Sequence, residues 1–184
     1  MSLDLGTGDG RLPYTLGRLG PERLFVGIDA NVAGLRELSG RAVRERLANV
    51  IYVRASVEDP PVELAGAADR VTVVLPWGSL LAAVARPHGP ALAAIRSLCQ
   101  PEAVLSVVVS VAGRDLREAQ RLGLPPLDGR HLQDLAAAYA AAGFAVTSVR
   151  PLDRDELAAW PSTWARRLAH GQPRPVFQID ASAR

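Results

Sequence analysis

Short apolar segments of β type alternate along this chain with Ala- and Leu-rich segments of helical periodicity. This alternation is typical of repeated strand–helix units around a mostly parallel sheet. The segments 71–75 and 104–109 are apolar on both faces, as the buried central strands of a parallel sheet are. We predict strands at residues 3–5, 24–29, 50–54, 70–75, 103–110, 144–150 and 175–179. We predict helices at residues 11–19, 32–44, 79–85, 89–98, 115–122, 131–142, 155–159 and 163–169.

Seven strands separated by helices suit a doubly wound α/β fold, in which helices cover both faces of one sheet. The 184 residues are enough for one such domain and too few for two of ordinary size. The sequence contains no internal repeat, low-complexity tract or linker, so residues 1–184 are predicted to form a single domain. In an open sheet of this kind a ligand binds beyond the carboxyl ends of the strands, near the point where the strand order reverses.

Composition excludes several classes of protein. The hydrophobic fraction of 48% is that of a globular chain, and no apolar run reaches the roughly 18–20 residues of a membrane span. The first residues lack the basic and apolar regions of a signal peptide, which favours a soluble, cytoplasmic protein. Cys99 is the only cysteine, and His88, His131 and His170 show no ligand spacing, so we expect neither a disulfide nor a metal site.

A glycine-rich turn follows the first predicted strand. Residues 4–11 read D-L-G-T-G-D-G-R, where Asp4 belongs to the strand and Gly6, Gly8 and Gly10 form the turn before a helix. Glycines at such a turn let the backbone approach a ligand closely. The spacing differs from the G-x-G-x-x-G of dinucleotide-binding folds. A plain glycine turn that leads into a helix is the alternative.

Two further acidic positions fit a nucleotide-like ligand. Asp29 ends the second predicted strand about 20 residues after the turn, where a carboxylate can accept both hydroxyl groups of a ribose. After the third strand, Val57 can pack on a purine ring while Glu58 accepts its amino group. An exposed loop acid is the alternative for Glu58. The glycine turn together with Asp29 is much more specific than either part, and the combination looks like the cofactor loop of class I methyltransferases.

The fourth predicted strand ends in V-L-P-W-G-S at residues 74–79. In amino-methyltransferases this position holds a polar residue, two prolines and an aromatic, and the polar side chain receives an exocyclic amine. Here the first position is Leu75, while Pro76 and the aromatic Trp77 remain. We infer a target atom that already carries a lone pair and has no proton to remove, such as N1 of adenine.

A second indole, Trp164, lies within S-T-W-A-R-R-L at residues 162–168. Two indoles can hold an extruded base by stacking, at about 1–3 kcal/mol per contact. Alkylation of N1 leaves adenine cationic, and indole faces favour that charge by roughly 0.5–2 kcal/mol. Core packing is the alternative for Trp77 and Trp164 taken singly, although a position between Pro76 and Gly78 is a poor one for a core residue. We interpret the third tryptophan, Trp160, as structural.

All 21 cationic side chains are arginines, and the formal net charge is only +2. Arginine binds phosphate through two parallel hydrogen bonds and stacks on bases, which lysine does less well. Each arginine cluster read alone fits a solvated surface, but beside a base-binding site the clusters can hold RNA phosphates. The predicted RNA-binding residues are Arg41, Arg44, Arg46, Arg121, Arg166, Arg167 and Arg174.

The motifs at 4–11 and 162–168, together with P-W-G-S-L-L at 76–81 and G-L-P at 123–125, resemble the kanamycin–apramycin resistance family. These enzymes are 16S rRNA adenine-1408 N1-methyltransferases, and the likeness covers nearly the whole chain in order. The resemblance implies a class I, Rossmann-like fold whose last strand is antiparallel. It implies S-adenosylmethionine as cofactor, S-adenosylhomocysteine as product, and aminoglycoside resistance as the outcome.

The resemblance also implies a substrate and site residues. The substrate is the assembled small (30S) ribosomal subunit at the decoding-site helix of 16S rRNA, and we expect the enzyme to act as a monomer. The target adenine is extruded between Trp77 and Trp164, beside Pro76. Eight positions that hold or border the cofactor are Gly6, Asp29, Val57, Glu58, Val74, Ser79, Ser162 and Thr163, and we add Asp4, Gly8 and Leu75 to the predicted cofactor site. Arg167 and Arg174 match positions that contact RNA.

This sequence departs from the family pattern in three places. The family has an N-terminal β-hairpin before the first strand, whereas this chain begins inside that strand. The basic loop after the second helix is shorter, and Gln172 replaces a frequent cation. These departures predict a weaker hold on RNA. Two alternatives therefore stay open: a methyltransferase of small molecules, and a non-catalytic binding module with a degenerate methyltransferase fold.

Overall fold

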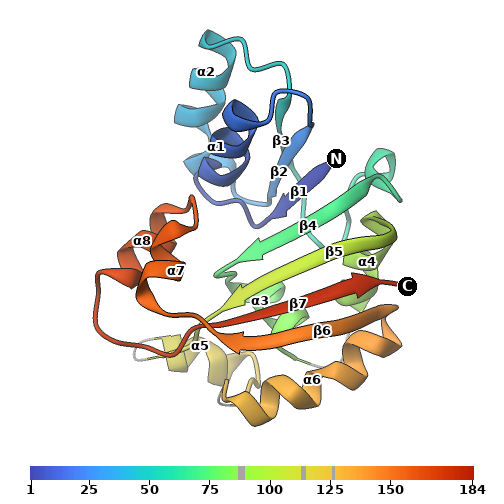
Figure 1. Ribbon diagram of the computed structural model, residues 1–184, viewed down its shortest axis with the longest axis vertical. Helices are drawn as coiled ribbons and strands as arrows, with labels where there is room; N and C mark the ends of the chain where they lie inside the picture. Colours follow the sequence, from blue (N-terminus) through green and yellow to red (C-terminus); the bar gives the residue numbers. More distant parts are fainter. Residues whose placement is uncertain (87–89, 113–114, 126) are drawn as a thin grey trace.

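The computed structural model describes residues 1–86, 90–112, 115–125 and 127–184. A seven-stranded sheet forms its centre, in the order β3-β2-β1-β4-β5-β7-β6 (Figure 1). The strands are β1 Ser2–Leu5, β2 Phe25–Asp29, β3 Val50–Arg54, β4 Ala68–Val74, β5 Cys99–Val109, β6 Phe144–Pro151 and β7 Phe177–Ala183. β7 runs antiparallel to β5 and β6, while the pairs among β3, β2, β1, β4 and β5 are parallel. The predicted fold class is confirmed.

Eight α-helices in the described part of the chain surround the sheet (Figure 1). They are α1 Arg11–Leu19, α2 Arg36–Arg44, α3 Gly78–Ala85, α4 Pro90–Leu98, α5 Leu116–Arg121, α6 Gly129–Ala141, α7 Arg154–Ala159 and α8 Thr163–Ala169. Two short 3-10 turns are η1 Val32–Gly34 and η2 Val62–Leu64. Among these residues no helix is both long and apolar enough to cross a bilayer. Gly89, predicted as the first residue of a helix, lies outside the described residues.

The predicted helix at 32–44 is wrong at its start, because η1 and α2 are separate elements. The side chain of Asn31 accepts a hydrogen bond from the backbone N–H of Ala33 and begins the short turn. Gly34 then packs against the glycine turn: a Cβ placed on Gly34 would lie 2.9 Å from the carbonyl oxygen of Gly8. We attribute the break between η1 and α2 to this close contact of Gly34 with the glycine turn.

The predicted end of the last strand, residue 179, is also wrong, since β7 continues to Ala183. The segment 180–183 has few residues with high strand propensity. Both of its edges are nevertheless paired, because Ser182 lies opposite Val104 of β5 and Ala183 lies opposite Phe144 of β6. Pairing on two sides, which depends on distant segments, extends the strand beyond its local signal.

The topology decides where a site can form. β1 lies between β2 and β4, to which it is parallel, so the loops that leave these strands meet at one edge of the sheet. Helices α7 and α8 lie at this same edge, beyond the ends of β4 and β5 (Figure 1). A small apolar cluster that includes Leu75, Val108 and Ala165 attaches α8 to those strand ends.

The main core fills the space between the sheet and its helices, with Leu3, Val71 and Leu105 at its centre, each fully buried. We expect Leu105→Ala to lower the free energy of unfolding by about 2–5 kcal/mol, because it leaves a cavity between packed layers. Chemical denaturation followed by circular dichroism measures this loss. The matched control is Leu19→Ala, whose side chain is 77% exposed and whose removal should change stability by less than about 0.5 kcal/mol. Equal losses for the two variants would contradict this description of the core.

Candidate cofactor and base-binding site

The turn after β1 depends on its glycines. Gly6, Gly8 and Gly10 adopt positive φ angles of 70°, 60° and 76°, a region that side chains disfavour. At Gly10 a Cβ would also lie 2.5 Å from the ring of Tyr52, whose hydroxyl donates to the Gly10 carbonyl at 2.8 Å. The left-handed backbone and this close contact from β3 together shape the turn that leads into α1.

Asp29 joins the turn to the end of β2. One carboxylate oxygen accepts the backbone N–H of Gly8 at 2.8 Å, and the other accepts that of Asn31 at 2.8 Å. Each oxygen keeps further acceptor capacity, because a carboxylate offers about four lone-pair positions. Asp29 therefore holds the glycine turn in place and can still accept hydroxyl groups from a ligand in the cavity.

Asp4 is the buried acid of the site. Its side chain accepts the Thr7 hydroxyl at 2.6 Å, and burial raises its pKa to about 7 despite that hydrogen bond. The nearby negative charges of Asp29 and Asp9 raise the pKa further. A cation bound in the cavity would lower the pKa of Asp4 again, since a nearby positive charge favours the ionised carboxylate.

The segment after β4 presents Trp77 at the start of α3, with 47% of the side chain exposed. Leu75 just before it has a φ of +51°, unusual for a residue other than glycine, and its buried side chain joins the cluster beneath α8. The strained backbone turns the chain sharply out of the strand. Pro76 and Trp77 thereby reach the cavity rather than the core.

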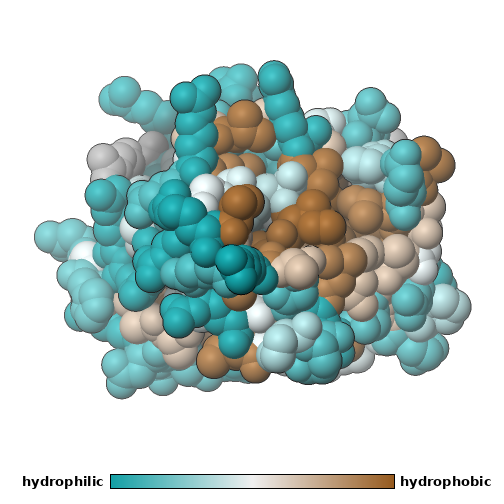
Figure 2. All heavy atoms as spheres, turned by 90° about the horizontal axis from the view of Figure 1, so that it is seen from above, coloured by the Kyte–Doolittle hydropathy of each residue, from teal (hydrophilic) through white to brown (hydrophobic). Residues whose placement is uncertain are grey.

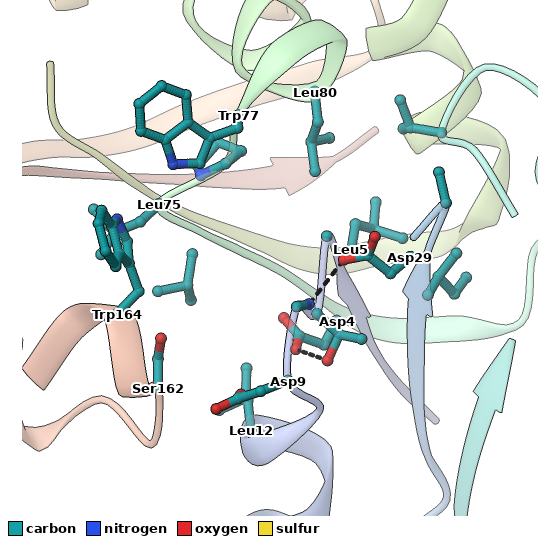
Figure 3. Close-up of a pocket in the computed structure, with 18 of the residues that line it drawn as sticks. Asp4, Leu5, Asp9, Leu12, Asp29, Leu75, Trp77, Leu80, Ser162 and Trp164 are labelled. Carbon is teal, nitrogen blue, oxygen red and sulfur yellow. Dashed lines mark hydrogen bonds between the residues drawn. The ribbon is translucent and has the colours of Figure 1, made fainter. Parts of the chain in front are cut away.

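Trp164 approaches from the other side, on α8. Trp77 and Trp164 both line the main cavity and a small hollow beside it (Figure 3). In Figure 3 the two indoles stand at one end of the cavity, while Asp4 and Asp29 lie toward the other end. The two rings are not stacked face to face in this view.

The first turn of α8 is fastened to the glycine turn. The Thr163 hydroxyl donates to a carboxylate oxygen of Asp9 at 2.5 Å and accepts from Nε of Arg11 at 3.0 Å. Ser162 caps the helix by accepting the backbone N–H of Ala165 at 3.3 Å. Thr163 and Trp164 are neighbours in the chain, so these contacts also set the position of the indole.

One cavity of about 590 Å³ is bordered by every residue that the sequence predicts for cofactor and base. These are Asp4, Gly6, Gly8, Asp29, Val57, Glu58, Val74, Leu75, Pro76, Trp77, Ser79, Ser162, Thr163 and Trp164. Its lining, as far as the structure describes it, contains four carboxylates, Asp4, Asp9, Asp29 and Glu58, and no arginine. Such a lining fits a ligand with positive charge and hydroxyl groups, and the volume is that of an ordinary small-molecule site. The individual roles of these residues stay predictions.

Glu58 also borders this cavity and is exposed. Hydrogen bonding by the Ser79 side chain lowers the pKa of its carboxyl below the usual range. The carboxylate is therefore ionised at neutral pH and can accept an amino group from a ligand. Glu58 and Ser79 were both predicted from the sequence. Only the folded structure shows that the loops after β3 and β4 bring their side chains together.

The predicted RNA-binding arginines are distributed unevenly. Arg41 and Arg44 lie in α2, and Arg46 follows with a φ of +57°; Arg166 and Arg167 are exposed on α8. Arg121 forms an ion pair with Glu118 at 2.6 Å within α5.

Arg174 is engaged by other residues of this chain. Its side chain is 13% exposed, pairs with the buried Asp115, and donates from Nε to the Ser110 hydroxyl at 2.8 Å. The guanidinium therefore holds the segment before β7 against the end of β5. In this arrangement Asp115 and Ser110 occupy part of its donor fork, and the RNA contact expected of Arg174 stays a prediction.

Sequence reasoning missed Asp9 and Arg11. Asp9 was seen only as part of the glycine turn, and its partner Thr163 is 154 positions away in the chain. No local signal could have paired them. The positive φ of Leu75 was also missed, because nothing in the amino-acid sequence indicates it. Among the described residues no group of three or more His, Cys, Asp or Glu could hold a metal, and His88 lies outside those residues.

The raised pKa of Asp4 has a consequence for stability. Because the folded-state pKa of about 7 exceeds the ordinary 3.8, folding favours the protonated form. The stability that this proton contributes is present at low pH and is lost as pH rises toward 7, by at most about 4 kcal/mol. We therefore expect Asp4→Asn to flatten the fall in unfolding free energy between pH 4 and 7, as measured by denaturant titration at several pH values. Parallel pH profiles for the two proteins would contradict the assignment.

Comparisons with known proteins identify the family of this chain. A family model described as NpmA: 16S rRNA (adenine(1408)-N(1))-methyltransferase matches residues 1–183. A protein of that same description from Escherichia coli is 32% identical, over 97% of this chain and 84% of its own length. One from Streptoalloteichus hindustanus is 33% identical, over 94% of this chain and 81% of its own length.

Solved structures are similar throughout the fold. The aminoglycoside resistance methyltransferase NpmB1 superposes with a TM-score of 0.84 at 39% identity, over 100% of this chain and 86% of that one. A mutant of the 16S rRNA (adenine(1408)-N(1))-methyltransferase from Catenulisporales acidiphilia, solved with the cosubstrate SAM, has a TM-score of 0.87 at 30% identity, over 99% and 84% of the two chains. The glycine turn, the acidic cavity and the paired indoles thus occur in a chain that belongs to the family of 16S rRNA (adenine(1408)-N(1))-methyltransferases.

Proposed function

We propose that this protein methylates N1 of adenine 1408 in 16S rRNA within the assembled 30S subunit, with S-adenosylmethionine as donor, and so confers aminoglycoside resistance. The observation that carries the proposal is a single cavity bordered both by the acidic nucleotide-type residues and by two indoles. Methyl transfer from a cosubstrate to an extruded base requires both molecules to lie in one cavity, because the two reacting atoms must come into contact.

The acidic half of the cavity fits the cofactor. In this proposal Asp29 accepts the ribose hydroxyls, and Glu58 accepts the adenine amino group with Val57 against the ring; all three border the cavity, which supports these roles. Asp4 and Asp9 supply negative charge at the glycine turn, where a sulfonium and an ammonium group would be stabilised. A solved relative carries the cosubstrate SAM, which supports the same ligand here.

The other half fits a base whose target atom needs no deprotonation. When bound, S-adenosylmethionine supplies an electrophilic methyl group. Leu75 offers no side-chain proton acceptor at the end of β4, and N1 of adenine needs none because it attacks with its own lone pair. The protein aligns the two reactants and excludes water, which is the usual contribution of a site without a protein nucleophile.

The indoles hold the base and favour the product charge. Trp77 and Trp164 border the cavity from α3 and α8, and their faces can stack on an extruded purine. N1 methylation leaves the ring cationic, and an indole face stabilises a nearby cation. That fixed positive charge at the decoding site opposes the binding of cationic aminoglycosides, which is how modification leads to resistance.

We further propose that residues 1–184 act as one domain and as a monomer, in the cytoplasm, where assembled subunits are found. Every strand in the described residues joins one sheet, which supports the single domain. The predicted cofactor and base residues all border one cavity within a single chain, which supports a site that one copy completes.

Trp77→Ala and Trp164→Ala should each reduce methylation of purified 30S subunits by 100-fold or more at fixed enzyme, on the order of the 1–3 kcal/mol lost per stacking contact plus misalignment. Primer extension on the treated rRNA measures the modification as a stop. Trp77→Phe keeps a stacking face and should retain part of the activity. Full stops with both alanine variants would refute the roles given to the indoles.

Asp29→Asn should weaken cofactor binding by about 10- to 100-fold, since hydrogen bonds to a charged group contribute roughly 1.5–3 kcal/mol. Isothermal titration calorimetry with S-adenosylmethionine measures the dissociation constant. Asp59→Asn removes an exposed carboxylate just past Glu58, outside the cavity lining, and should leave binding unchanged. If the wild-type protein bound no S-adenosylmethionine, a non-catalytic module would replace the proposed enzyme; methyl transfer to small molecules without ribosomes would instead contradict the RNA substrate.

A further inference from the structure

A second hollow, of about 390 Å³, lies between α1, α2 and the segment that joins α7 to α8. Four arginines line it, Arg11, Arg18, Arg41 and Arg166, together with Tyr14 and Trp160. Only Arg41 and Arg166 were predicted from the sequence to bind RNA. We call this space the arginine hollow.

The charge of the arginine hollow is opposite to that of the cofactor cavity. Its lining in the described residues contains four guanidinium groups and one carboxylate, Glu37. A second carboxylate, Glu45, lies close by but is engaged by Arg41, by Arg18 and by the Tyr14 hydroxyl. Neighbouring cavities of opposite charge are suited to ligand groups of opposite charge.

Two of the arginines are held by hydrogen bonds at Nε, and a third, Arg18, lies within ion-pair distance of Glu45. Nε of Arg11 donates to Thr163, Nε of Arg41 donates to Glu45 at 2.8 Å, and Nε of Arg18 lies 3.7 Å from Glu45. Within the part of the chain that the structure describes, their terminal Nη groups make no hydrogen bond. A guanidinium that is fixed at its Nε and free at both Nη atoms is preorganised to bind an anion.

Tyr14 organises two of these groups. The guanidinium carbons of Arg18 and Arg41 lie 5.9 Å and 5.4 Å from the centroid of its ring, and its hydroxyl donates to Glu45 at 2.6 Å. The Tyr14 ring therefore stabilises both guanidinium groups by cation–π contacts. Its hydroxyl also positions Glu45, the carboxylate with which both arginines pair. Trp160, half-buried at the C-terminal end of α7, adds a second aromatic wall.

The arginine hollow adjoins the cofactor cavity, and two residues connect them. Pro161 lines both spaces, and Arg11 donates to Thr163, the residue next to Trp164. Figure 2, seen from the side of α2, shows hydrophilic atoms gathered on the left, where Figure 1 places α1, α2, α7 and α8. A chain that enters the cofactor cavity with one base can therefore lay its backbone over this charged surface.

We propose that the arginine hollow binds a backbone phosphate of the substrate RNA next to the extruded adenine, with Arg18 and Arg11 as RNA contacts beyond those expected from the sequence. This inference rests on the proposed function and adds a position for the RNA strand. A phosphodiester offers only acceptor oxygens and matches the free Nη groups of several arginines at once. The bound phosphate would also stabilise Arg11 in the position from which it holds Thr163 and α8.

Arg18→Gln provides the test, because Arg18 is exposed and lies outside the cofactor cavity. The KM for 30S subunits should rise about tenfold, while the dissociation constant for S-adenosylmethionine stays unchanged. The slope of log affinity for subunits against log salt should fall by about one, as expected for one lost phosphate contact. Arg18→Lys keeps the charge without the planar fork and should restore the slope but only part of the affinity.

The matched control is Arg70→Gln, which removes the same charge from an exposed position near the start of β4 and should change neither KM nor slope. An unchanged KM and slope for Arg18→Gln, with wild-type enzyme fully active on subunits, would overturn this inference alone. A wild-type protein that binds S-adenosylmethionine but never methylates subunits would overturn the proposed function instead. If inorganic phosphate bound the wild type tightly and not Arg18→Gln, while subunit KM stayed equal in both, the hollow would be a site for free phosphate.

Discussion

The parallel pairing of β1 with both β2 and β4 is the constraint on which the site depends. It brings the glycine turn, Asp29 and the Leu75–Trp77 segment to one edge of the sheet, although they are separated by about 20 and 70 positions in the chain. The carboxylate of Asp29 then fixes the distance between the first two loops through the N–H groups of Gly8 and Asn31. Helix α8 completes the wall, held by Thr163 on one side and by the cluster around Leu75 on the other.

Two adjoining spaces of opposite charge follow from this arrangement. The cofactor cavity is lined by carboxylates, and burial costs one of them, Asp4, part of its ionisation at neutral pH. The arginine hollow on the other side of Pro161 is lined by guanidinium groups that are already fixed by Tyr14, Glu45 and Thr163. A cationic cofactor and an anionic RNA strand would thus meet complementary surfaces on either side of Pro161.

Most of the fold was within reach of sequence reasoning, because buried strands and amphipathic helices follow from local patterns of apolar residues. The errors came where tertiary contacts override local preference. Gly34 breaks the second helix because it must lie against Gly8, and β7 runs on to Ala183 because strands on both sides pair with it. The candidate site was predictable to the extent that its residues belong to short motifs. Arg174 also pairs with Asp115, and no pattern near either residue indicates that partnership.

The sequence by itself determined the strand–helix order, the glycine turn, the acidic residues at strand ends and the absence of a polar acceptor at Leu75, since each of these is a property of neighbouring residues. Only the tertiary structure decided which of them meet. The bond between Asp9 and Thr163, the strained φ of Leu75 and the grouping of Arg11, Arg18, Arg41 and Arg166 arise from segments that are distant in the chain. The physical reason is that local conformation depends on short-range sterics and periodicity, whereas charge complementarity and packing depend on which surfaces the folded sheet places together.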